Sequence, residues 1–159
     1  MFESILVPVD GSGPSNAAVN VALGLAHERK AQITFVHAYD VIGEVGMAPH
    51  ANLGLAEQVA EDQASDILAA ATAAAKRAGV KSVAKTLEGN VVEEILREAK
   101  ATGASIIVVG SHGRTGLSRA LLGSVSEGIA RRSDIPVLTV HAPKDEKAPH
   151  ECGKWITIL

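Results

Sequence analysis

Residues 105–125 read SIIVVGSHGRTGLSRALLGSV, an apolar run followed by a glycine-rich loop. The run, residues 105–110, is short, β-branched and apolar on both faces, which is typical of a strand buried inside a parallel sheet. Four more runs share this character: SILVPV (4–9), QITFVHA (32–38), SVAKTL (82–87) and IPVLTV (135–140). The sequence therefore predicts five short apolar strands.

The segments between these runs have the spacing of helices. Apolar residues recur three or four positions apart in residues 17–25 and 92–99, and residues 53–78 form an alanine-rich stretch with one apolar face. Because strand and helix alternate, we expect an α/β domain, a doubly wound five-stranded parallel sheet with helices on both faces. Such sheets bind ligands outside the carboxyl ends of their strands, where the winding direction reverses.

Local signals mark several helix ends. Asn90 stands three residues before Glu93, as in a capping box, and Gly79 and Gly103 follow periodic stretches where a left-handed cap is expected. Residues 40–52 show no periodicity, and we expect a mobile loop there.

Composition excludes several classes of protein. The chain has 159 residues, 47% hydrophobic and 21% charged, with a formal net charge of -3, so it suits one compact domain and lacks the basic field that nucleic acid requires. The single cysteine, Cys152, cannot form an internal disulfide, and no apolar run reaches the roughly 20 residues of a membrane helix. The amino terminus lacks a signal-peptide pattern. We expect a cytoplasmic protein that neither binds nucleic acid nor inserts into a membrane, with one domain over residues 1–141 and a tail over 142–159.

The loop after the first strand, VPVDGSGPSNAA (7–18), carries Asp10 at the end of a strand and Gly11 and Gly13 in the turn that follows. A carboxylate there is able to accept hydrogen bonds from ribose hydroxyls or an exocyclic amine. The alternative is that Asp10 only forms an Asx turn and that Ser15 caps the helix that follows. The loop does not match G-x-G-x-x-G, because Asn16 stands at the third glycine position.

The loop after the fourth strand has the pattern G-x-x-G-x(9)-G-S, with glycines at 110, 113 and 123. Residues without a Cβ let backbone amides converge on anionic oxygens. Ser124 stands three residues before Glu127 as in a capping box, and the helix start there attracts phosphate. The alternative is a flexible connector whose glycines serve only tight turns. Because the fold independently predicts a ligand at this loop, we favour phosphate binding.

No catalytic or metal-binding set stands out in the sequence. The six histidines have no metal-site spacing, Walker A is absent, and a triad of Ser111, His112 and Asp10 is disfavoured because adjacent residues rarely meet that geometry. We expect no metal site and no designed catalysis, with slow hydrolysis of a bound phosphate compound at most.

The segments ILVPVDGS (5–12), FVHA (35–38) and GSHGRTGLSRALLGSVSEGIARRSDIPVLTV (110–140) resemble the universal stress protein family. The resemblance covers residues 2–141 and implies strand order 3-2-1-4-5 and, since the glycine motif is complete, binding of ATP, with Mg²⁺ as a candidate companion. The residues that it assigns to adenosine are Pro8, Val9, Asp10 and the backbone of Ala38. Those that it assigns to the phosphates are Gly110, Gly113, Gly123, Ser124 and Val125, with His112 and Arg114 as adjacent candidates.

The resemblance also implies a homodimer through the last sheet strand, an adenine nucleotide as ligand and a regulatory role toward a protein partner. Ala38 stands where the family often has a larger aliphatic residue, which puts the fit of the adenine pocket in question. Two other functions stay open, namely an adenine nucleotide hydrolase or phosphotransferase and a nucleotide-free dimeric scaffold. Residues 142–154 are expected to be flexible. The terminal WITIL (155–159) would add a strand to the sheet edge, dock in a groove or be disordered, and we favour docking.

Overall fold

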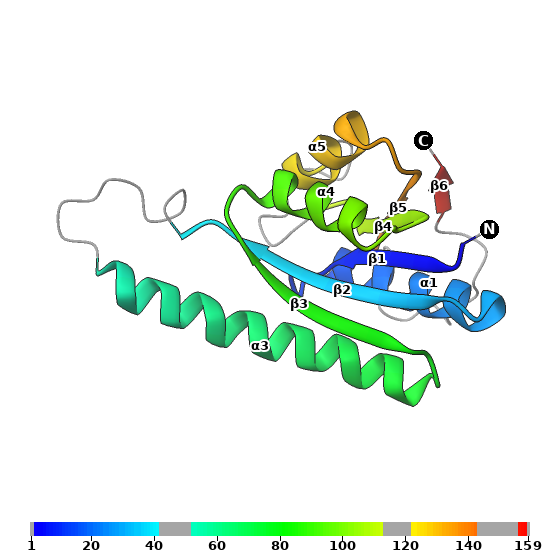
Figure 1. Ribbon diagram of the computed structural model, residues 1–159, viewed down its shortest axis with the longest axis horizontal. Coiled ribbons are helices and arrows are strands. Elements are labelled where there is room, and N and C mark those ends of the chain that lie inside the picture. Colours follow the sequence, from blue (N-terminus) through cyan, green and yellow to red (C-terminus); the bar gives the residue numbers. More distant parts are fainter. Residues whose placement is uncertain (1, 42–51, 113–121, 143–155, 159) are drawn as a thin grey trace.

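The computed structural model describes residues 2–41, 52–112, 122–142 and 156–158. Five parallel strands run in the order β3-β2-β1-β4-β5, as predicted, and β6 adds an antiparallel strand beside β5 (Figure 1). The strands are β1 (Ser4–Pro8), β2 (Gln32–Tyr39), β3 (Ser82–Glu88), β4 (Ile106–Gly110), β5 (Val137–Val140) and β6 (Ile156–Ile158). The winding direction reverses between β1 and β4, so the carboxyl ends of these two strands border the expected ligand-binding edge.

Two helices cover each face of the sheet (Figure 1). The helices are α1 (Gly13–Arg29), α3 (Leu53–Arg77), α4 (Val91–Ala101) and α5 (Ser124–Arg132). In β1, Ile5 and Val7 pack toward α1 and α3, whereas Leu6 packs toward α4 and α5. Burial of each such side chain contributes about 1.5–3 kcal/mol, which explains why the inner strands are apolar on both faces. β3, at the edge of the sheet, is mostly exposed. Within the described residues, no helix combines the length and the apolar character needed to cross a membrane.

Most of the predicted boundaries are confirmed to within one residue. Asn90 caps α4 by accepting a hydrogen bond from the Glu93 amide at 3.2 Å, and Gly79 and Gly103 have φ angles of +68° and +61°. The last parallel strand begins two residues later than predicted, because the Ser133 hydroxyl bonds both backbone groups of Ile135. The expected mobile loop falls largely on residues 42–51, which lie outside the described part of the chain.

The carboxyl-terminal residues differ from two expectations, namely that the last parallel strand is an edge strand and that the terminal segment docks in a groove. Residues 156–158 form β6, which pairs with Leu138, Thr139 and Val140, so β5 is an inner strand and the favoured groove docking is wrong. The Ser111 amide donates to the Val140 carbonyl, so the backbone groups of Val140 face β4. The N–H and C=O groups of neighbouring residues in a strand point to opposite edges, so those of Thr139 face β6. Residues 142–154 were expected to be flexible, and residues 143–154 lie outside the described part of the chain.

Deleting residues 143–159 is expected to promote dimerisation through the β5 edge. Without β6, the N–H and C=O of Thr139 lose the strand that they face, and an open edge is completed when a second copy pairs with it antiparallel. Size-exclusion chromatography with light scattering, across increasing protein concentration, measures the mass. The full chain is the control, and equal masses for the two proteins would show that β6 does not govern this edge.

Candidate functional site

A cavity of about 320 Å³ lies at the edge where the winding reverses. The carboxyl ends of β1, β2 and β4 and the first turn of α5 line it, and α3 and α4 supply the side walls. Nine of the eleven predicted site residues line this one cavity, namely Pro8, Val9, Asp10, Ala38, Gly110, His112, Gly123, Ser124 and Val125. The other two, Gly113 and Arg114, lie outside the described residues.

Further residues of the wall were not predicted from the sequence. They are Ser15, Val36, His37, Tyr39, Ala60, Gln63, Val91, Ile95, Val109 and Ser126. Most of them are apolar residues on regular elements, which sequence periodicity assigns to the core without separating a cavity wall from packed interior. Ser15, His37, Gln63 and Ser126 are polar, and among these four His37 stands at the carboxyl end of a strand, which is a polar signal that the sequence does contain.

The turn between β1 and α1 is held by hydrogen bonds between its own residues. The Ser12 amide donates to Asp10 Oδ1 at 2.9 Å, so the Asx turn is present, and the Asp10 amide donates to Ser15 Oγ at 3.1 Å. Ser12 Oγ caps α1 by accepting from the Ser15 amide at 3.3 Å. A carboxylate offers about four acceptor positions, so the Asx turn and a contact from Asp10 to a ligand are compatible.

The backbone of Ala38 faces the cavity because β2 extends beyond the end of β1. The Val9 amide donates to the Val36 carbonyl at 2.8 Å, which shows that the backbone groups of Val36 point toward β1. Residues two apart in a strand point the same way, so the N–H and C=O of Ala38 also point to that side. β1 ends before this level, and the cavity lies there instead.

Gly110 is glycine for a packing reason that the sequence did not reveal. A Cβ on Gly110 would lie 2.6 Å from Pro14 C, 2.7 Å from Ser15 N and 2.8 Å from Pro14 O. These are backbone atoms at the start of α1, so they cannot move aside as a flexible side chain would. The absent side chain thus lets α1 begin directly against the end of β4, and the two cavity-lining turns lie close together.

The first turn of α5 presents backbone amides to the cavity. Gly123 is the N-cap residue, and its amide donates to the Ser111 carbonyl at 2.8 Å. The predicted capping box with Ser124 as cap is therefore wrong; Ser126 Oγ instead donates to the carbonyls of Ser111 and Gly123, both at 2.9 Å. The first helical bond runs from Glu127 to Gly123, which leaves the amides of residues 124–126 without a partner within the helix.

His112 contributes a buried nitrogen that has no hydrogen-bond partner among the described residues. Its Nδ1 lies 3.1 Å from Ser111 Oγ and its carbonyl accepts from Ser12 Oγ at 3.4 Å, whereas no atom of residues 2–41, 52–112, 122–142 or 156–158 bonds its Nε2. Leaving such an atom buried and unpaired costs about 1–3 kcal/mol, so it requires an explanation. Since His112 lines the cavity beside Gly110 and Gly123, a ligand with oxygen acceptors would satisfy an Nε2–H donor.

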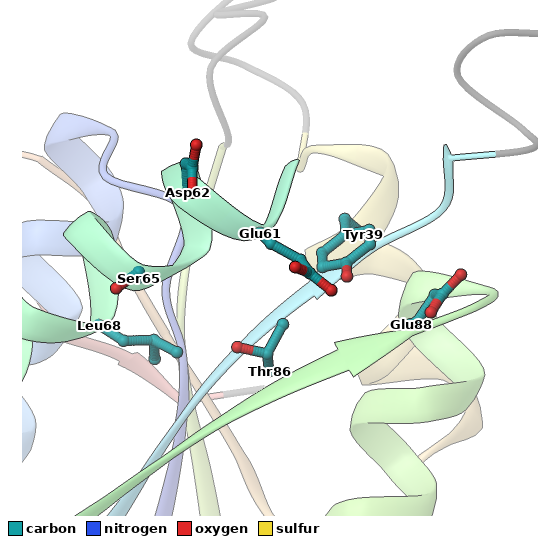
Figure 2. Close-up of a pocket in the computed structure, with 7 residues that line it drawn as sticks. All are labelled: Tyr39, Glu61, Asp62, Ser65, Leu68, Thr86 and Glu88. Atoms are coloured by element: carbon teal, nitrogen blue, oxygen red, sulfur yellow. The ribbon is translucent and has the colours of Figure 1, made fainter. Parts of the chain in front are cut away.

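A second, larger hollow of about 640 Å³ lies between α3 and β3 (Figure 2). Carboxylates of Glu61, Asp62 and Glu88 line it, with Tyr39 shared between the two cavities. Burial raises the pKa of the Tyr39 hydroxyl, and the negative charges of Glu88, Glu61 and Glu57 raise it further. A polyanion would meet the same repulsion, so this acidic hollow is unsuited to phosphate.

Taken together, these features define a class: a doubly wound α/β protein with an amide-lined cavity at the switch between β1 and β4. The chain belongs to the universal stress protein family, whose sequence pattern matches residues 1–141. It is 34% identical over 146 residues to universal stress protein MJ0531 of Methanocaldococcus jannaschii, covering 92% of this chain and 86% of that protein.

Two solved structures show the same fold. Protein MJ0577 superimposes with a TM-score of 0.80 at 26% identity, over 91% of this chain and 99% of that one. A universal stress protein in complex with cAMP superimposes with a TM-score of 0.65 at 29% identity, over 89% of this chain and 98% of that one.

Proposed function

We propose that this protein is a cytoplasmic ATP-binding universal stress protein that acts as a nucleotide-dependent regulatory module in a stress response. The observation that carries the proposal is the meeting of nine sequence-predicted residues, from β1, β2, β4 and α5, on one cavity. The similar universal stress protein that binds cAMP supports an adenine nucleotide as the ligand.

The phosphates are proposed to lie at the β4–α5 end of the cavity. The amides at the start of α5 that have no partner within the helix carry partial positive charge, and His112 Nε2 would add one more donor. Ser124 is exposed, and no cap bond occupies its hydroxyl. Gly113 and Arg114 belong to the proposed phosphate site by their place in the motif.

The adenosine is proposed to lie at the β1–β2 end. Asp10 would accept from the ribose hydroxyls, and the Ala38 backbone would face the base. The apolar wall residues Val91 and Ile95 of α4 lie at the same cavity and suit the faces of a purine ring.

Binding without designed turnover is the favoured form of the proposal, and weak ATP hydrolysis is the most that we expect. Rapid phosphoryl transfer needs a group that orients the nucleophile together with positive charge at the γ-phosphate. The Asp10 carboxylate is assigned to the sugar end, and the described phosphate end holds amides, a serine and a histidine. A homodimer through the β5 edge is proposed only for chains in which β6 has left that edge.

The test is nucleotide binding by the full purified chain. We expect mass spectrometry to detect adenine nucleotide released from the fresh protein, and calorimetry to show one ATP bound per chain, with little phosphate released in the presence of Mg²⁺. Sustained phosphate release would favour the hydrolase or phosphotransferase. No retained nucleotide and no heat of binding would favour the nucleotide-free scaffold and overturn the proposal.

A further inference from the structure

We infer that His37 is a positioning and specificity residue for the 6-amino group of a purine: its Nδ1–H holds the Val9 carbonyl away from the Ala38 amide, and its Nε2 accepts from the amine. The inference rests on the proposed nucleotide function and assigns within it a residue that the glycine motif does not contain. His37 lies in β2, directly before Ala38, and lines the cavity.

The first part of the argument concerns the end of the β1–β2 ladder. After the bond from the Val9 amide to the Val36 carbonyl, a regular parallel ladder would continue with a bond from the Ala38 amide to the Val9 carbonyl. The Ala38 amide and the Val9 carbonyl do not form this bond. The Val9 carbonyl is bound by His37 Nδ1 instead, at 2.7 Å. A side chain has thus taken the place of the next ladder bond.

This exchange determines what the cavity presents. If the Ala38 amide were bound to Val9, it would have no hydrogen left for a ligand. With His37 bound to that carbonyl, the Ala38 N–H points to the β1 side, where β1 has ended, and is able to donate to a ring nitrogen of the base. His37 therefore acts on the ligand first by positioning the backbone of its neighbour.

The second part concerns the tautomer of His37. A carbonyl oxygen only accepts hydrogen bonds, so Nδ1 carries the hydrogen, and Nε2 of the neutral ring is an acceptor. The residue is 8% exposed, yet Nε2 is not one of the buried side-chain atoms left without a partner. Its ring makes no other hydrogen bond within the described residues, and its neighbour on one side is the Tyr39 ring, at 6.4 Å between centroids. Nε2 therefore keeps solvent access at the cavity.

An acceptor at this point discriminates between purines. The 6-amino group of adenine is a donor and satisfies Nε2, whereas a purine with hydrogen at position 6 leaves the lone pair unsatisfied. Purine riboside triphosphate is the suitable probe, because it keeps the ring nitrogen that would face the Ala38 amide and lacks only the amine.

Two substitutions separate the two roles of the imidazole. In His37→Asn, the side-chain amide nitrogen replaces Nδ1 and keeps the bond to Val9, but nothing replaces Nε2. In His37→Phe, an aromatic ring is kept and both nitrogens are lost. Circular dichroism melting checks that each variant is folded, and Asn is the milder change if Phe prevents folding.

We expect the wild-type protein to prefer ATP over purine riboside triphosphate by roughly 10-fold or more in titration calorimetry. In His37→Asn the preference should fall to within about threefold, while a measurable affinity for ATP remains. A preference unchanged in both variants would overturn the acceptor role. Loss of the preference for ATP over 2′-deoxy-ATP instead would show that Nε2 serves the ribose, and would overturn it as well.

Hydrogen exchange of the Ala38 amide, measured without nucleotide, tests the positioning role by itself. The amide should exchange rapidly in the wild-type protein and in His37→Asn. In His37→Phe it should become protected by about 10-fold or more, because the Val9 carbonyl is then available to it. Equal exchange in all three proteins would overturn the positioning role. Since this readout needs no ligand, it is distinguishable from a failure of the nucleotide proposal, in which no protein would bind ATP.

Discussion

Gly110→Ala is expected to lower the free energy of unfolding by about 3 kcal/mol, which corresponds to a fall in melting temperature of roughly 6–12 °C for a chain of this size. The added methyl group would lie within 2.8 Å of three backbone atoms of Pro14 and Ser15. Relieving that overlap requires α1 to move away from β4, and this disturbs helix–sheet packing that buries Ala18 and Ala22 completely.

Gly24→Ala is the matched control for this change. Gly24 is an exposed position within α1, and a Cβ there would meet nothing within 4 Å. Since alanine is favoured over glycine inside a helix, this variant should gain about 0.5–1 kcal/mol in stability. Thermal and urea unfolding followed by circular dichroism measure both variants. If Gly110→Ala unfolded like the wild type and lost only ATP affinity, glycine at 110 would serve the phosphates rather than the packing of α1.

Ser124→Asp should weaken ATP binding by roughly 100-fold, because the new carboxylate would stand beside the phosphates at the first turn of α5 and like charges in such a site cost several kcal/mol. The same carboxylate should stabilise the folded protein by about 0.3–1 kcal/mol, since it complements the positive end of the helix. Affinity and stability would therefore change in opposite directions. Few alternatives to an anion site at this helix start predict that combination.

Two controls accompany the Ser124→Asp measurement. Ser124→Ala removes the hydroxyl without adding charge and should cost about 10-fold or less in ATP affinity. Adenosine lacks phosphates, so calorimetry should give the same adenosine affinity for Ser124→Asp and the wild type. An ATP affinity of Ser124→Asp equal to that of Ser124→Ala would place the phosphates away from α5.

Parts of the proposed site were evident from sequence patterns, and the reasons for others were not. The spacing of glycines 110 and 123 pointed to loop ends that line one cavity in the structure. The reason for glycine at 110, however, is its contact with Pro14 and Ser15 of another element. The capping box predicted at Ser124 does not form, because the Ser111 carbonyl binds the Gly123 amide and makes Gly123 the cap. Local patterns cannot show such contacts, since the partner is far away in sequence.

The sequence by itself determined the five parallel strands, their connecting helices and the edge at which a ligand should lie. Periodicity and helix caps depend on neighbouring residues, and a sheet buried on both faces tolerates few other patterns. Only the tertiary structure decided that β6 covers the β5 edge and that His37 binds the Val9 carbonyl. These outcomes depend on which backbone groups remain unpaired once distant segments have come together, and that is a property of the assembled sheet.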